Sequence, residues 1–481
     1  MDEKKLKNIC IYFIVIVAVS GILFFAVAHR QMNFREETTD SLTPSYNVGE
    51  LTSGMIIEQD FTPQNDTVKA FSVIFQTFMR ENHGSVTIEI LDGENVLYQT
   101  ETDLSSATEN EKRDFCVSPE LTGVKGKKLT LRLTVQSGES GSAATVAYGN
   151  SIAAGRAEIG VATEEPLRVN GEEVNGQLCM TVTTVCKLWF GSVYWYFYGA
   201  GVLLSVLYSR RLLRYQRRDK SCRGLAFLNA VVRYRFLISQ LVNRDFRTRY
   251  KRSVLGMFWS FLNPLLSMLV QYVIFSTIFQ SNIPHYPAYL LTGIVCFNYF
   301  SETAGLCLTS ITSNSSLLTK VYMPKYIFPL TRALSSGINL LLSLIPLAIV
   351  VLATGLRLRA SMLLLPIWAI CLFSFSLGIG LLLSSSMVFF RDTQFLWGVF
   401  SMLWMYMTPI FYPDSIIPTR MMGIYKLNPM FHILRLFRAL LIDGASPEPK
   451  AYLFCFIAAF VPLLIGLVVF KKTQDRFILY V

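Results

Sequence analysis

Eight stretches of apolar residues, most of them about 20 residues long, limit what this 481-residue chain can fold into. A stretch of this length crosses a bilayer as a helix, because a helix satisfies its own backbone hydrogen bonds. Charged residues make up 16% of the chain, against roughly 25% in a soluble domain. The sequence therefore predicts an integral membrane protein and excludes a soluble enzyme or a disordered scaffold. We predict crossings over residues 9–28, 188–208, 256–279, 289–311, 328–354, 362–389, 395–411 and 451–470.

The distribution of charge predicts the orientation of these crossings. Residues 209–255 hold 14 basic and 2 acidic residues directly after the second crossing, which places that segment in the cytoplasm. Residues 30–187 hold 13 basic and 23 acidic residues, a net charge of −10, and are predicted to lie outside. Both termini then lie in the cytoplasm. The basic residues mostly flank apolar runs, so membrane orientation explains the chain's net charge of +11 without a nucleic-acid partner.

The first apolar stretch has two interpretations. It follows three lysines and ends in Ala26-Val27-Ala28, a shape that resembles a signal-peptide cleavage site. Its apolar core is longer than the 7–15 residues of a signal peptide, which favours a retained anchor over residues 1–29. The second crossing, residues 188–209, then returns the chain to the cytoplasm.

Residues 30–187 change from helical to strand-like patterning. In the segment 128–137, Leu129, Leu131, Leu133 and Val135 alternate with polar residues, and Ser85 to Leu91 alternates likewise. Several short strands with period-2 patterning, separated by turns, predict an antiparallel β-sandwich, with a jelly roll as the preferred variant. Cys116 and Cys179 would both face an oxidising compartment, but the sequence does not decide whether they pair.

The cytoplasmic segment 210–255 contains an amphipathic pattern over residues 223–241, typical of a helix that lies in the membrane interface. A string of ordered residues follows it and runs into the third crossing. The string has the form R-D-x-x-x-R-Y-x-x-S-x-L-G-x-x-W-x-x-L-x-P. Its residues are Arg244, Asp245, Arg249, Tyr250, Ser253, Leu255, Gly256, Trp259, Leu262 and Pro264.

This string resembles the membrane subunits of type 2 ABC exporters that move O-antigen, teichoic acid and related polysaccharides. Later segments resemble the same family: 314–330 its cytoplasmic loop, 389–397 its cytoplasmic turn, and 408–413 with 427–429 its external region. The resemblance covers residues 223–481. It implies a six-span permease core over residues 256–481, with an external re-entrant region at about 412–450. Typical members lack the first 209 residues.

The resemblance also implies partners. We find no G-x-x-x-x-G-K-[ST] loop in the sequence, so the chain by itself is not expected to be an enzyme that hydrolyses ATP. Two copies of a separate ABC ATPase would bind ATP and Mg²⁺, and a second copy of this chain would complete a homodimer in the bacterial plasma membrane, among its lipids. The substrate would be a lipid-linked glycan. The residues expected to couple to the ATPase are Arg244, Asp245, Arg249, Tyr250, Lys320, Pro324 and Lys325.

The translocation path would lie among the core spans. Glu302 is a candidate because an ionisable group within a crossing is costly; it could also pair with another helix or lie near the interface. Aromatic rings could stack on sugars, or could simply face lipid or pack between helices. The aromatic candidates are Trp259, Phe297, Tyr299, Phe300, Trp404, Tyr406, Phe411 and Tyr412. The external domain could shape the exit of this path or bind glycan; it has no dense cluster of Trp and Tyr.

Other functions remain open at this point. A membrane-embedded glycosyl- or acyltransferase would need clustered Asp, Glu or His at membrane depth. The chain has four histidines with no carboxylate pair beside them. A transmembrane sensor would need a cytoplasmic output domain, whereas the second half of this chain consists of further spans. An ABC exporter of a different lipid or a drug is also compatible with the composition. The nine cysteines show no CxxC pair, so no metal site is expected.

Overall fold

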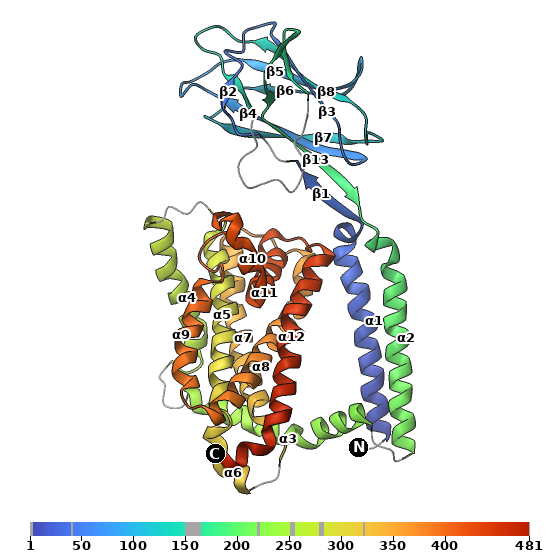
Figure 1. The fold of residues 1–481 in the computed structure, drawn as a ribbon, viewed down its shortest axis with the longest axis vertical. Coiled ribbons are helices and arrows are strands. Elements are labelled where there is room, and N and C mark those ends of the chain that lie inside the picture. Colours follow the sequence, from blue (N-terminus) through green and yellow to red (C-terminus); the bar gives the residue numbers. More distant parts are fainter. Residues whose placement is uncertain are drawn as a thin grey trace. The chain divides into compact units, whose positions relative to one another are not determined.

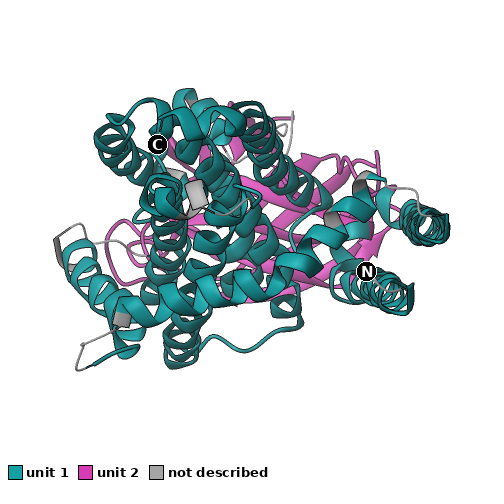
Figure 2. Ribbon diagram, turned by 90° about the horizontal axis from the view of Figure 1, so that it is seen from below, with its two compact units in different colours: residues 1–32, 190–481 teal, residues 33–189 magenta. Residues whose placement is uncertain are grey.

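The computed structural model describes residues 3–39, 42–149, 165–218, 222–250, 255–278, 283–320 and 323–480. These residues form two compact units, a helical unit (residues 1–32 and 190–481) and a β unit (residues 33–189), coloured separately in Figure 2. Each unit has its own hydrophobic core.

The β unit consists of two antiparallel sheets. The larger sheet has the order β1-β13-β4-β9-β12, with β2 paired to β9 and β7 paired to β4. Its strands are β1 (Phe34–Thr38), β2 (Tyr46–Asn47), β4 (Thr67–Gln76), β7 (Glu111–Thr122), β9 (Thr145–Gly149), β12 (Gln177–Leu178) and β13 (Met180–Lys187). The second sheet has the order β11-β10-β3-β8-β5-β6. Its strands are β3 (Ile56–Phe61), β5 (Ser85–Asp92), β6 (Asn95–Asp103), β8 (Leu129–Ser137), β10 (Leu167–Val169) and β11 (Glu172–Val174).

The two sheets share one hydrophobic core. Strand β8 contributes Leu129, Leu131 and Leu133, all fully buried, as its alternating pattern predicted. Phe71 and Phe75 of β4, in the other sheet, belong to the same cluster. Alternate residues of a strand point to opposite faces, so one face of each sheet fills this core and the other carries polar groups.

Charged groups on the outer faces of the β unit are paired. Asp60 lies 2.8 Å from Arg168 Nη2 and 3.3 Å from Lys128 Nζ. Burial raises the pKa of Asp60, but the hydrogen bond from Thr130 and the charge of Arg168 outweigh it and lower the pKa overall. Glu50 accepts hydrogen bonds from Arg80, Ser140 and the backbone of Gly141, which lower its pKa to about 2.

The two cysteines left open by the sequence are both free thiols. Cys116 is exposed on β7, whereas Cys179 is buried between β12 and β13. Burial raises the pKa of the Cys179 thiol to about 12, so this cysteine acts as a small apolar side chain of the core.

Among the described residues, the helical unit contains nine helices of 14 residues or more. Figure 1 shows their arrangement. They are α1 (Glu3–Asn33), α2 (Phe190–Arg217), α3 (Arg223–Tyr250), α4 (Phe258–Val273), α5 (Tyr286–Leu308), α7 (Ile327–Ala353), α8 (Leu365–Phe389), α9 (Thr393–Tyr406) and α12 (Pro449–Thr473), with α4 extended by η1 (Ile274–Ile278). The shorter helices are η2 (Thr312–Asn314), α6 (Ser315–Lys320), η3 (Ala360–Leu364), η4 (Asp414–Ile416), α10 (Thr419–Leu427), α11 (Pro429–Arg438), η5 (Ala439–Asp443), η6 (Gln474–Arg476) and α13 (Phe477–Tyr480).

The number of helices that are able to cross a membrane differs from the eight crossings predicted from the sequence. Seven of the described helices are long and apolar enough to cross a membrane, and α3, predicted to lie in the interface, is one of them. Helices α5 and α9, both predicted to cross, are not in this set. Helix α9 has 14 residues, or about 21 Å at 1.5 Å per residue, which is shorter than a bilayer core of roughly 30 Å. The count of eight therefore stays a prediction.

The core of the helical unit is built around α5, α7, α8 and α12, which lie side by side (Figure 1). Two glycines allow α8 and α12 to approach closely. A Cβ atom at Gly378 would lie 2.5 Å from the backbone nitrogen of Leu463, and one at Gly466 would lie 2.3 Å from the carbonyl oxygen of Gly378. Small residues at such contacts let membrane helices pack backbone to backbone.

Helices α1 and α2 form a pair held by tyrosines. Tyr194 and Tyr198 of α2 donate hydrogen bonds to the carbonyl oxygens of Gly21 (2.8 Å) and Ala18 (2.7 Å) of α1. These carbonyls belong to a helix interior, so the tyrosines join the two helices without interrupting α1.

Candidate functional site

A polar pocket of about 670 Å³ lies among α4, α5 and α7. Its walls carry the amides of Asn263, Asn298 and Asn339 and the hydroxyls of Ser260, Ser267, Ser301 and Ser343, together with Trp259, Arg249 and Glu302. Asn298, Ser301 and Glu302 follow one another at helical spacing on α5, as Asn339 and Ser343 do on α7, so each set shares one helix face. Polar side chains in apolar helices are costly and mark functional paths.

Glu302 is the centre of the interactions in this pocket. Its Oε1 accepts hydrogen bonds from Arg249 at the end of α3 and from Asn339 Nδ2 of α7, the latter at 2.9 Å. The Arg249 and Glu302 side chains are 33% and 29% exposed. Glu302 therefore both lines the pocket and pairs with another helix of the same chain, which combines two of the interpretations that the sequence allowed.

A second ion pair attaches α3 to the bundle. Asp245 Oδ2 lies 2.8 Å from Arg332 Nη1 of α7, and Arg244 Nη2 lies 3.0 Å from Asp245 Oδ1. The Asp245 side chain is 9% exposed. Sequence reasoning selected Arg244 and Asp245 but missed Arg332, although an arginine inside the apolar stretch 328–354 was a visible signal.

The other end of α3 is attached to α1 and α2. Leu225 is buried together with Leu6 and Cys10 of α1 and Leu212 of α2. A Cβ atom at Gly224 would lie 2.0 Å from the hydroxyl of Tyr208, so the start of α3 fits closely against α2. Helix α3 thus connects the α1–α2 pair to the helices that form the polar pocket.

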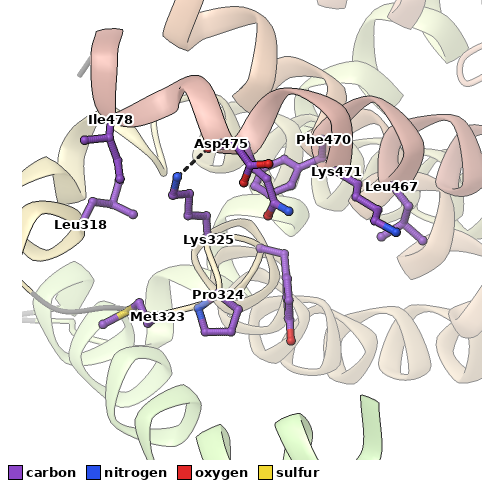
Figure 3. Close-up of a pocket in the computed structure, with 11 residues that line it drawn as sticks. Leu318, Met323, Pro324, Lys325, Leu467, Phe470, Lys471, Asp475 and Ile478 are labelled. Carbon is purple, nitrogen blue, oxygen red and sulfur yellow. Dashed lines mark hydrogen bonds between the residues drawn. The ribbon is translucent and has the colours of Figure 1, made fainter. Parts of the chain in front are cut away.

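The segment around Pro324 and Lys325, called the coupling segment below because these residues are expected to couple to the ATPase, packs against the C-terminal helices (Figure 3). Lys325 Nζ donates a 2.6 Å hydrogen bond to the carbonyl oxygen of Gln474, and Phe477, fully buried, lies against Phe470. Lys325, Pro324 and Lys471 contribute to a pocket of about 500 Å³ beside this contact. Lys320 ends helix α6, and its side chain, like that of Tyr250, lies outside the described residues.

The aromatic path candidates occupy different environments. Trp259 lines the polar pocket, and Tyr406 is 58% exposed on α9. Phe297, Tyr299, Phe300 and Phe411 are buried in the helical core. Trp404 donates a 2.7 Å hydrogen bond to Asn428, and Tyr412 donates one of the same length to the carbonyl oxygen of Tyr406. Sequence reasoning missed the pocket's asparagines and serines, although an asparagine in an apolar stretch was a readable signal.

The described residues contain no group of three or more His, Cys, Asp or Glu side chains placed to hold a metal ion. What the site offers is a polar surface between membrane helices, joined by ion pairs to a basic helix. Such an arrangement suits the passage of a polar molecule and defines a multi-pass membrane permease.

Comparison with known proteins agrees with this class. Residues 237–442 match the family model for the ABC-2 type transporter. The O-antigen export system permease protein RfbA of Klebsiella pneumoniae is 31% identical over 242 residues, which cover 50% of this chain and 93% of that protein. RfbA of Myxococcus xanthus is 28% identical over 255 residues, covering 53% and 98%. The polysialic acid transport protein KpsM of Escherichia coli is 24% identical over 242 residues, covering 50% and 93%.

The chain belongs to the ABC-2 type transporter family, as the motifs of residues 244–264 and the later segments predicted.

Proposed function

We propose that this chain is the permease subunit of an ABC exporter that moves a lipid-linked polysaccharide, such as O-antigen or teichoic acid, across the bacterial plasma membrane. The named functions of its relatives, O-antigen export and polysialic acid transport, support this substrate class. The energy would come from two copies of a separate ATPase subunit, which bind ATP and Mg²⁺. Two copies of the permease would enclose the path.

The observation that carries this proposal is the polar pocket among α4, α5 and α7. Amides and hydroxyls both donate and accept hydrogen bonds, as sugar hydroxyls do, so they can replace the water that a glycan loses on entering the membrane. Trp259 adds an aromatic face on which a sugar ring can stack. A purely apolar cargo would leave these polar groups unsatisfied.

Movement would reach this pocket through α3. The ATPase would contact the basic helix α3 and the segment around Pro324 and Lys325, and nucleotide binding would move α3 as a rigid element. Arg249 and Asp245 would pass that movement to α5 and α7, because each forms an ion pair with one of them. The pocket would then change shape with the nucleotide state.

The β unit would lie outside the membrane as a jelly roll, with both chain termini in the cytoplasm. The sheet orders support this topology, since β1-β13-β4-β7 and β3-β8-β5-β6 are the two four-stranded sheets of a jelly roll. The net charge of −10 over residues 30–187 and their position before the basic segment support the outside location.

Purification from the native membrane tests the proposal. We expect a nucleotide-binding subunit to copurify in equal amount and to hydrolyse ATP, and we expect a strain that lacks this chain to lose its surface polysaccharide. Alanine replacement of Pro324 and Lys325 should weaken the association, whereas replacement of Lys450, at the start of α12 and away from that segment, should not. A chain that purifies alone, from a strain whose polysaccharide is independent of it, would contradict the proposal.

A further inference from the structure

A small pocket of about 190 Å³ lies where α5 meets α11 and η5, at the end of the bundle opposite α3 and α6 (Figure 1). This volume is smaller than the roughly 300–1,000 Å³ of pockets for drug-sized ligands, and so suits a single ring. Tyr289, Phe431 and four charged residues line it.

One of the charged residues, Arg438, is almost completely buried, at 8% exposure. Its guanidinium carbon lies 3.5 Å from the centre of the Tyr289 ring, and its Nη atoms donate to the Tyr289 hydroxyl (2.7 Å) and to the carbonyl oxygens of Pro409 (2.6 Å) and Ile410 (2.9 Å). Its Nε has no hydrogen-bond partner among the described residues. A buried donor of this kind is normally satisfied, so it favours an additional acceptor in the pocket.

The other three charged residues are Asp414, Arg435 and Asp443. Within the part of the chain that the structure describes, their side chains form no ion pair within 4.0 Å and no hydrogen bond. Asp414 is half-buried, and Arg435 and Asp443 are exposed at the mouth of the pocket, so their polar groups are open to a ligand that enters it.

The charges identify the chemistry of that ligand. Two arginines and two aspartates give the pocket a formal charge of zero, so neither an anion nor a metal cation is favoured. Carboxylates accept hydrogen bonds and guanidiniums donate them. A neutral ligand with several hydroxyl groups satisfies both, because each hydroxyl donates one hydrogen bond and accepts others.

We infer that this pocket binds one neutral sugar unit of the exported glycan, a step that rests on the proposed function. Tyr289 stands 13 positions before Glu302 on α5, which corresponds to about 20 Å along the helix. The small pocket and the polar pocket thus both border α5, at levels about 20 Å apart along its axis. The small pocket would hold the chain as it leaves.

Ligand-observed NMR with the full chain in lipid nanodiscs tests the inference. The probes are methyl glycosides of glucose, galactose, mannose and rhamnose, with inorganic phosphate and Ca²⁺ as charged comparisons. We expect saturable binding of at least one glycoside, weakened about tenfold or more in Asp414→Asn and Arg435→Gln, because each variant removes a charge-assisted hydrogen bond. The matched controls, Asp392→Asn and Arg420→Gln, change exposed residues outside the pocket and should leave binding unchanged.

Three results would overturn the inference: no glycoside binds, phosphate or Ca²⁺ binds in its place, or the pocket variants bind as the controls do. Using two pocket variants keeps the test valid if one of them misfolds. A strain that loses its polysaccharide without the chain, while no glycoside binds, contradicts this pocket alone. A strain that keeps its polysaccharide contradicts the proposed function, whatever the pocket binds.

Discussion

The two units of this protein use charged side chains in opposite ways. In the β unit several carboxylates lie on outer faces and pair with nearby strands or loops through side chains that are at least a quarter exposed, as Asp92 does with Lys127 and Glu50 with Arg80. In the helical unit the ion pairs of Asp245 and Glu302 join helices far apart in the chain, and the Glu302 pair lines the polar pocket. Pairs of the first kind shape a surface, and pairs of the second kind join helices of the bundle to α3.

The surroundings explain this difference. An exposed ion pair in water contributes roughly 0–1 kcal/mol, because water competes for both charges. A charge among apolar helices has no such alternative, so removing its partner is costly. The same kind of substitution should therefore have a large effect in the helical unit and a small one in the β unit.

The largest effect is expected for Arg332→Ala. The Asp245 side chain is 9% exposed and would keep only Arg244, so the free energy of unfolding should fall by about 3 kcal/mol, the lower end of the range for a broken buried pair. Thermal unfolding of the chain in detergent measures this. Arg391→Ala, in the exposed turn between α8 and α9, serves as the control. Equal melting temperatures for the two variants would show that the Asp245 pair behaves like a surface pair.

A smaller effect is expected for the pair of Arg249 and Glu302, since both side chains are about a third exposed. Replacing either one with alanine should cost about 2 kcal/mol, the range for a hydrogen bond to a charged group. The free energy of unfolding should fall less in the double variant than the sum of the two single changes. Each single change leaves one charge without its partner, whereas the double variant removes both charges. Strict additivity in this double-mutant cycle would mean that the two residues act independently.

Sequence patterning predicted the parts of the fold that depend on local periodicity. Strand β8 was predicted because its leucines alternate with polar residues over the whole strand. Strand β7 (Glu111–Thr122) was missed, because it buries little besides Phe115 and Val117 and contains Pro119. Strand β7 forms because it pairs with β4, and a local sequence pattern does not reveal such a pairing between distant segments.

The residues of the candidate functional site likewise divide into those that a local pattern predicts and those that only the fold brings together. Asp245 and Arg249 could be selected from the ordered motif at the start of the core, but their partners could not. Arg249 and Glu302 are 53 positions apart, and only the packing of α3 against the bundle brings them together. The charges of the small pocket, Asp414 and Arg438 among them, come from three separate elements and likewise form a site only after folding.

Two lysines beside the coupling segment, Lys325 and Lys471, can be compared directly within the helical unit. Lys325 and Lys471 line the same pocket, but Lys325 donates to Gln474 whereas Lys471 is exposed and makes no described contact. Lys325→Met should lower the amount of glycan exported per ATP hydrolysed several-fold, because the segment loses a contact worth about 1.5 kcal/mol. Lys471→Met should leave the ratio nearly unchanged. Export and ATP hydrolysis measured on the same vesicles give the ratio, and an equal decrease in both variants would point to a general loss of positive charge.

The smallest effect is expected at Glu50 in the β unit, and it should depend on pH. Hydrogen bonds from Arg80, Gly141 and Ser140 lower the folded-state pKa of Glu50 to about 2, below its usual value of 4.5. Folding thus favours the ionised carboxylate, and its contribution is complete above pH 4.5 and lost as the pH falls towards 2. Hydrogen-exchange protection of the Gly141 amide, which donates to Glu50, should decrease over this interval in the full chain and should be low at every pH in Glu50→Gln. Because the pair lies at the surface, with the Glu50 side chain 25% and the Arg80 side chain 34% exposed, the rest of the β unit should keep its protection. A decrease that spread through β4 and β8 would show that this surface pair stabilises the fold as much as the pairs among the helices do.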